Sequence, residues 1–261
     1  MHMILHAGPP KTGSTTLQSA LWRNAGALAR QGVHVWRADE PQEWAFVLDT
    51  AALAGGLFPI LRLHFDDAGA ARRWSSGQWA AFEGWVDAVM PEVCVVSSEH
   101  LAGVDDPAPL VARFRHRFGR ISLIAYARDP VELWLSQISE LAKLGMSVGE
   151  LPPPGGDSFA PYARLRRWGQ ALGPAALQIR PLAAGALAGG DLVADFGAAL
   201  SALAGRPLEP LDPPERQNAR LPGAAVAWLL AQNATFVTFR SDASDRDEIR
   251  RHRAVVDRLS A

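Results

Sequence analysis

The sequence has one cysteine, Cys94, among 261 residues, so it cannot form an internal disulfide and does not support a cysteine-based zinc site. It also lacks a strong excess of either charge: the formal net charge is -1, so a globally basic nucleic-acid-binding surface is not expected. No uninterrupted apolar run approaches the roughly 18 residues of a membrane span. The opening residues, MHMILHAGPPK, lack the basic start and the longer apolar run of a signal peptide. We therefore expect a cytoplasmic protein with no membrane span and no nucleic-acid partner.

The composition is that of an ordinary globular protein, with 48% hydrophobic and 20% charged residues. A chain of this length can bury one large core. We expect a single domain over residues 1–261, interrupted by irregular insertions near 41–90 and 146–160.

The hydrophobic pattern predicts an alternation of strands and helices. A short apolar strand over 3–7 leads into a glycine-containing loop, and a helix is expected from Ser14 until Gly32. This order is typical of a parallel α/β fold, so we expect a three-layer architecture, a parallel sheet flanked by helices. The other strands are expected at 33–36, 93–99, 121–127 and 177–182. The other helices are expected near 42–54, 68–89, 108–118, 128–145, 160–172, 191–204, 222–234 and 245–259.

The loop after the first strand, HAGPPKTGSTTLQ, is similar to a nucleoside-triphosphate loop, G-x-x-x-x-G-K-[ST]. Gly8 and Gly13 have the spacing of its glycines, and Thr15 stands at its last position. The lysine position, however, is occupied by Ser14, and Lys11 lies inside the loop. The loop therefore does not match the pattern that holds the β- and γ-phosphates of ATP.

The chemistry of this loop still favours an anion. Backbone N–H groups at the start of a helix, together with the helix dipole, attract negative charge. The hydroxyls of Ser14, Thr15 and Thr16 and the ammonium group of Lys11 add further donors. The loop thus predicts phosphate or sulfate binding, with a tight turn that only caps a helix as the structural alternative.

A second motif, YARDPVELWLSQ over 126–137, follows another apolar strand. Arg128 ends that strand, and Ser136 lies two turns into the helix that Asp129 and Pro130 begin. Ligands of parallel sheets gather at the carboxyl ends of the strands. Because both motifs follow strands, we expect them at one edge, where the planar guanidinium of Arg128 suits a phosphate.

The two motifs together resemble the sulfotransferases that use 3′-phosphoadenosine 5′-phosphosulfate (PAPS), in particular their bacterial branch. The resemblance implies a fold like that of the P-loop NTPases. It implies that the first motif binds the phosphosulfate, through Lys11, Thr12, Gly13, Ser14, Thr15 and Thr16. It implies that Arg128 and Ser136 bind the 3′-phosphate, and that the product is adenosine 3′,5′-bisphosphate (PAP). The basic carboxyl-terminal motif of the cytosolic branch is not visible, and its candidate replacements are Arg216, Asn218 and Arg220.

Sulfuryl transfer to a hydroxyl or amine group also needs a general base. The segment VVSSEHL supplies two candidates, Glu99 and His100, at the end of the third expected strand. The resemblance favours Glu99 and leaves His100 as the alternative; it also implies that Lys11 neutralises charge on the leaving oxygen. We expect a small-molecule or carbohydrate acceptor, recognised by the insertions near 41–90 and 146–160.

Two other functions fit parts of the pattern. An ATP-dependent small-molecule kinase with an atypical loop would need Mg²⁺, whereas the sulfotransferase reaction is in-line and metal-independent. A catalytically degenerate member that only binds a nucleotide is the non-enzymatic alternative, against which Lys11, Arg128 and Ser136 argue. We expect no metal site.

Overall fold

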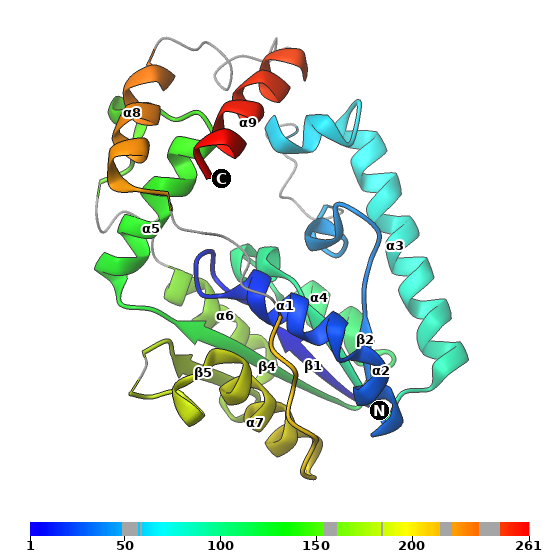
Figure 1. Ribbon diagram of the computed structural model, residues 1–261. Helices are drawn as coiled ribbons and strands as arrows, with labels where there is room; N and C mark the ends of the chain where they lie inside the picture. Colours follow the sequence, from blue (N-terminus) through cyan, green and yellow to red (C-terminus); the bar gives the residue numbers. More distant parts are fainter. Residues whose placement is uncertain are drawn as a thin grey trace.

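The computed structural model describes residues 1–48, 57, 59–153, 161–183, 185–214, 221–234 and 246–260. Within them, five strands form one parallel sheet in the order β2-β3-β1-β4-β5 (Figure 1). The strands are β1 (His2–His6), β2 (Val33–Trp36), β3 (Val93–Ser97), β4 (Arg120–Ala127) and β5 (Leu177–Pro181). All five predicted strands are confirmed, although β3 ends two residues before Glu99.

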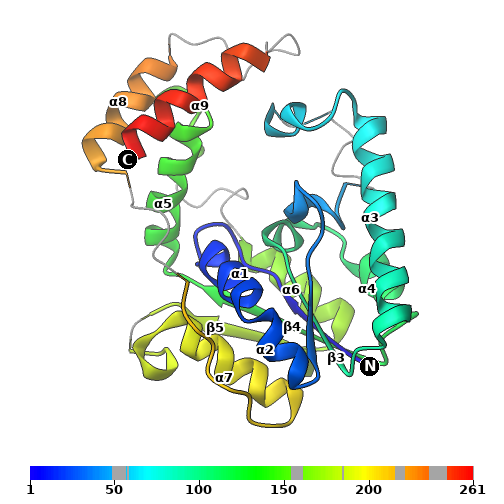
Figure 2. The ribbon, with the colours of Figure 1, turned by 45° about the vertical axis from the view of Figure 1, so that its right-hand side comes forward.

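Helices cover both faces of the sheet, as the sequence predicts. On one face lie α3 (Ala68–Val89), α4 (Ala108–Arg115) and α6 (Pro161–Leu172); on the other lie α1 (Ser14–Arg23), α2 (Ala25–Arg30) and α7 (Leu192–Ala204) (Figures 1 and 2). Alternate residues of β1 enter the two cores: Met3 packs with the α3 side and Ile4 with the α1 side. A strand covered on both faces must be apolar throughout, which explains the continuous hydrophobic run of β1.

A third group of helices stands beyond the carboxyl ends of the strands. There α8 (Gly223–Asn233) and α9 (Arg246–Ser260) lie against α5 (Pro130–Lys143) (Figure 2). Helix α5 begins as predicted: the carboxylate of Asp129 accepts hydrogen bonds from the backbone N–H groups of Val131 and Glu132, and Gly145 follows its end with φ 89°. Because α5 directly follows β4, it rises from the edge of the sheet where Arg128 lies.

Two predicted helices differ from the structure. The helix expected from Ser14 to Gly32 is broken at Asn24, whose side-chain amide donates to the carbonyl oxygens of Ala20 and Asp212 at 2.8 and 2.9 Å. Such a side chain competes with the helical backbone pattern. The helix expected near 42–54 is replaced by a short 3-10 helix, η1 (Gln42–Trp44), and 49–56 lies outside the described residues.

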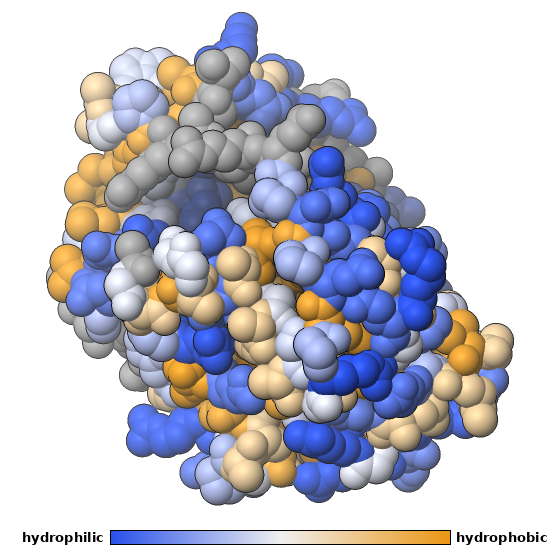
Figure 3. Space-filling model, turned by 60° about the horizontal axis from the view of Figure 1, so that its bottom comes forward, coloured by the Kyte–Doolittle hydropathy of each residue, from blue (hydrophilic) through white to orange (hydrophobic). Residues whose placement is uncertain are grey.

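The remaining described elements are short 3-10 helices: η3 (Pro59–Leu63), η4 (Glu99–Gly103), η5 (Val148–Glu150), η7 (Pro174–Ala176) and η8 (Ala188–Gly190). The face on the side of α7 mixes hydrophilic and hydrophobic residues (Figure 3). In the described part of the chain, no helix combines the length and the hydrophobicity that crossing a bilayer requires.

Candidate active site

A cavity of about 860 Å³ opens at the carboxyl edge of the sheet, and we call it the edge cavity. Most of its lining comes from the loop after β1, the η1 segment, the start of η4, and Arg128 with α5; Leu144, Met146, Pro152 and Leu221 complete it. Nearly all the predicted site residues therefore meet in one place: Lys11, Gly13, Ser14, Thr15, Thr16, Glu99, His100, Arg128 and Ser136.

The loop after β1 has the backbone of an anion cradle. Lys11 has φ 66° and Gly13 has φ 86°, and positive φ is uncommon for a residue such as lysine. The φ of Gly13 favours glycine, and a Cβ atom there would also lie 2.3 Å from Leu192 Cδ2, so a larger residue would displace that side chain. Helix α1 then begins at Ser14 without a side-chain hydrogen bond capping its amides. Its first N–H groups thus remain available for a ligand at the helix N-terminus.

Thr12 has a different place from the other loop residues. It is fully buried, and its hydroxyl donates a 2.7 Å hydrogen bond to the carbonyl oxygen of Pro9. The backbone N–H of Thr12 also donates to the Pro9 oxygen, at 3.3 Å, so Thr12 fixes the shape of the loop from inside rather than offering a donor to an anion.

Both lysines of the edge cavity contact one carboxylate. Lys11 Nζ lies 2.6 Å and Lys143 Nζ 2.9 Å from Glu140 Oε1. Burial by itself raises the pKa of Glu140, but hydrogen bonds from the two lysines outweigh burial and hold the pKa below its usual value. Glu140 is therefore a carboxylate close to the anion-binding features of the loop.

Arg128 is fixed beside the same loop. Its Nη1 atom lies 3.4 Å from the carbonyl oxygen of Lys11, and its Nε donates to Glu132 at 3.0 Å. The hydroxyl of Tyr162, from α6, accepts from the Arg128 N–H at 3.0 Å and donates to the Arg128 carbonyl oxygen. These bonds fix the backbone where β4 passes into α5, so the two sequence motifs converge as the parallel topology predicts.

Glu99 is connected directly to the loop. It opens η4 rather than ending β3, and its Oε2 accepts a hydrogen bond from Ser14 Oγ at 2.5 Å. Burial raises the pKa of Glu99, while the bond from Ser14 and the charge of Lys11 act in the opposite direction. A largely desolvated carboxylate beside the first turn of α1 has the properties of a general base.

His100 differs from Glu99 in its surroundings. Its ring stacks on that of Trp44, with centroids 3.6 Å apart and planes inclined by 27°, and burial lowers its pKa to about 4. His6, which precedes the loop, is completely buried; its Nδ1 lies 2.7 Å from Ser97 Oγ, and burial also lowers its pKa to about 4. Both rings are therefore neutral near pH 7, and His6 is a core residue.

Glu43 is a site residue that sequence reasoning missed. It lines the edge cavity, and Ser98 Oγ donates to its carbonyl oxygen at 2.7 Å, which fixes η1 beside Glu99. Burial, followed by the charge of Glu99, raises the pKa of Glu43 to about 7, while the nearby Gln18 side chain acts in the opposite direction. No local pattern marks this residue, because only the tertiary packing of η1 on η4 places it here.

Glu140 and Lys143 were also missed, although the sequence does hold a signal for them. They follow Ser136 by four and seven residues, a spacing that puts all three on one side of α5. The candidates for a third phosphate contact, Arg216, Asn218 and Arg220, lie outside the described residues.

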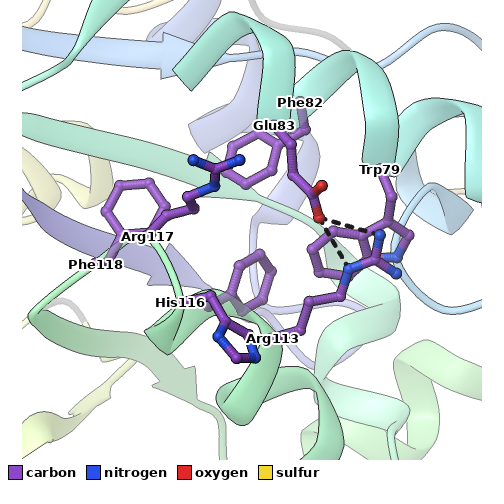
Figure 4. A pocket seen from close by; sticks show the side chains of 8 residues that line it. Trp79, Phe82, Glu83, Arg113, His116, Arg117 and Phe118 are labelled. Carbon is purple, nitrogen blue, oxygen red and sulfur yellow. Dashed lines mark hydrogen bonds and ion pairs between the residues drawn. The ribbon is translucent and has the colours of Figure 1, made fainter. Parts of the chain in front are cut away.

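A second cavity of about 520 Å³ lies between α3 and α4, and we call it the α3–α4 cavity (Figure 4). Arg113 lies over the ring of Trp79, with Cζ 3.9 Å from the ring centroid, and its Nη2 is 3.1 Å from Glu83 Oε1. Arg117 Nη1 lies 2.6 Å from Asp87 Oδ1. Each arginine thus has its own carboxylate. Among the described residues, no three His, Cys, Asp or Glu side chains gather as a metal site would require.

The fold and this site define an α/β protein with a cavity suited to anions at the carboxyl edge of its sheet. No protein-family model matches the chain, and no curated protein matches it either.

Three solved structures that align with the chain are sulfotransferases. The sulfotransferase domain from the curacin biosynthetic pathway is 15% identical, with 98% of this chain and 96% of that chain covered and a TM-score of 0.46. The sulfotransferase from Alicyclobacillus acidocaldarius is 11% identical, with 89% of this chain and 92% of that chain covered and a TM-score of 0.47. The sulfotransferase domain from the Synechococcus PCC 7002 olefin synthase is 13% identical, with 98% of this chain and 94% of that chain covered and a TM-score of 0.43. Likeness at this level does not assign a function, which must come from the site.

Proposed function

We propose that this protein is a PAPS-dependent sulfotransferase that transfers a sulfuryl group to a hydroxyl or amine group. One observation carries the proposal: the loop of Lys11 and the end of β4 at Arg128 meet in the edge cavity, and Ser14 connects that loop to the carboxylate of Glu99. This arrangement supplies anion-binding groups and a base side by side, which sulfuryl transfer requires.

The donor-binding residues follow from the two motifs. The first amides of α1, the hydroxyls of Ser14, Thr15 and Thr16, and Lys11 would hold the phosphosulfate. Arg128 and Ser136 would hold the 3′-phosphate, because they line the same cavity from the β4 side. The uncapped start of α1 and the positive φ of Gly13 support this fit. When bound, PAPS supplies the activated sulfuryl group, and PAP is the product.

Two residues would act on the reacting atoms. Glu99 would remove the proton from the acceptor oxygen or nitrogen, because its desolvated carboxylate lies against Ser14 at the loop. Lys11 would stabilise the negative charge that develops on the leaving phosphate oxygen. Neither role requires a metal ion. We favour Glu99 over His100, whose ring is stacked on Trp44 and has a lowered pKa.

The test is calorimetric titration of the protein with PAP and with ATP, each with and without Mg²⁺. We expect metal-independent PAP binding that is lost in the Arg128→Ala variant. Arg113→Ala is the matched control, because it removes the same side chain from the α3–α4 cavity. Mg²⁺-dependent ATP binding without PAP binding would instead indicate a kinase. PAP binding without turnover against any hydroxyl or amine acceptor would indicate a degenerate member.

A further inference from the structure

The lysines of this chain are few and share one place. Among its 26 lysine and arginine residues, only Lys11 and Lys143 are lysines, and both line the edge cavity. Both ammonium groups contact the same oxygen, Glu140 Oε1, at 2.6 and 2.9 Å. Two ammonium groups on one carboxylate give this trio a net charge of one positive.

The trio is only partly exposed. The side chains of Lys11, Lys143 and Glu140 are 33%, 23% and 35% exposed, so solvent screens their charges less than it screens those of freely exposed pairs. A lysine ammonium is also a compact charge on a flexible stem, able to exchange one anionic partner for another. An arginine in bidentate contact would be held more rigidly.

We propose that Lys143 is a second cation for the donor's anionic group, and that Glu140 competes with that group for Lys11. The inference rests on the proposed function. Before the donor binds, Glu140 pairs with Lys11. An incoming phosphate or sulfate oxygen takes the place of Glu140 on Lys11, and Lys143 keeps Glu140 neutralised while it faces the same anion.

This arrangement gives the two α5 residues opposite effects on anion affinity. A carboxylate inside an anion site repels the ligand and competes for Lys11, so its removal strengthens binding. Lys143 offsets the charge of that carboxylate. Removal of Lys143 therefore weakens binding for two reasons: one cation is lost, and the charge of Glu140 is no longer neutralised. An ion pair that does not face the bound anion would show no such opposition of sign.

The experiment measures affinity by calorimetry with PAP and inorganic pyrophosphate as probes. Glu140→Gln is expected to strengthen binding, and Lys143→Met to weaken it, each by about threefold or more, as for partly exposed ion pairs. Lys143→Arg should stay close to wild type because it keeps the charge. Glu83→Gln is the matched control: that side chain is 34% exposed and is paired with Arg113, but it lies in the α3–α4 cavity.

A second readout uses the scarcity of lysine. Protein labelled with [15N]lysine has two side-chain Nζ resonances, one from Lys11 and one from Lys143, and both should shift when either probe binds. The inference would be overturned if the Lys143 resonance did not shift with either probe, or if Glu140→Gln bound the probes more weakly than wild type. Equal affinity for PAP and pyrophosphate, with both resonances shifting, would instead count against PAPS as donor and leave the lysine assignment standing.

Discussion

The edge cavity and the α3–α4 cavity are built from similar side chains, yet they are suited to different tasks. In the α3–α4 cavity each arginine has its own carboxylate, Arg113 with Glu83 and Arg117 with Asp87, and Trp79 covers one guanidinium. In the edge cavity two lysines share Glu140, so this trio carries one net positive charge. Basic side chains alone therefore do not distinguish an anion site from a structural ion-pair cluster.

The backbone makes the larger difference. The edge cavity contains a loop with positive φ at Lys11 and Gly13, followed by a helix start without a side-chain cap. The side chains lining the α3–α4 cavity come from the interior of α3 and from the second half of α4 and the residues just after it, so that cavity has no helix N-terminus. Unpaired amide donors at a helix start favour anions whatever the side chains do.

The largest effect is expected from Lys11→Met in the edge cavity. Formation of PAP from PAPS should fall by about 10²- to 10³-fold, the usual loss when one charge-stabilising donor is removed. Arg113→Met, the corresponding loss of a cation in the α3–α4 cavity, should leave the rate unchanged. If the rate fell equally in Lys11→Met and Arg113→Met, the edge cavity would not be distinguished from the α3–α4 cavity as the reaction site.

The next effect concerns the base. Glu99→Gln should lower the same rate by roughly 10²-fold or more, because proton removal from the acceptor is lost. Glutamine can still accept the hydrogen bond from Ser14 Oγ, and the variant removes a negative charge from the anion site, so PAP affinity should not fall. His100→Gln is the comparison within the cavity, and a larger loss there than in Glu99→Gln would make His100 the base.

The sequence was sufficient to predict most of the strands and helices around both cavities. The three central strands, β1, β3 and β4, were predictable because buried parallel strands are largely apolar, and the two motifs were predictable because both follow such strands. Lys11 and Arg128 could therefore be placed at one edge without a structure. The break at Asn24 and the short η1 were not predicted, because a hydrogen bond to distant Asp212 and the packing of Trp44 on His100 determine them.

The same division holds for the site residues. Glu140 and Lys143 share a side of α5 with Ser136, but the sequence does not show how α5 stands over the loop. Glu43 lines the cavity because η1 packs beside η4, where the carbonyl oxygen of Glu43 accepts a hydrogen bond from Ser98. Local patterns predict which residues share an element, whereas contacts between elements decide which carboxylates face one another.

Glu43 should also make stability depend on pH. Burial, followed by the charge of Glu99, raises its pKa in the folded protein to about 7. A carboxyl whose folded pKa lies above its unfolded value stabilises the protein below the unfolded pKa, and this contribution is lost as pH rises through about 7. Between pH 5 and pH 8 we expect a loss on the order of 2 kcal/mol from this group.

Chemical denaturation at both pH values tests this expectation. Glu43→Gln should reduce the loss, because glutamine does not ionise. Glu40→Gln is the control, since Glu40 is 67% exposed and contributes least to the pKa of Glu43. An unchanged loss in Glu43→Gln would mean that the Glu43 carboxyl ionises normally in the folded protein.

The smallest effect is expected in the α3–α4 cavity. Arg113→Ala removes the contact with the Trp79 ring and the ion pair with Glu83, both at a half-exposed site, and should lower the free energy of unfolding by about 1 kcal/mol. PAP affinity and the rate should stay at wild-type values, because the contacts of Arg113 belong to the α3 side of the core. If Arg113→Ala weakened PAP binding without destabilising the protein, the α3–α4 cavity would itself be a ligand site. The contrast between paired arginines and a shared carboxylate would then no longer distinguish an anion site from a structural ion-pair cluster.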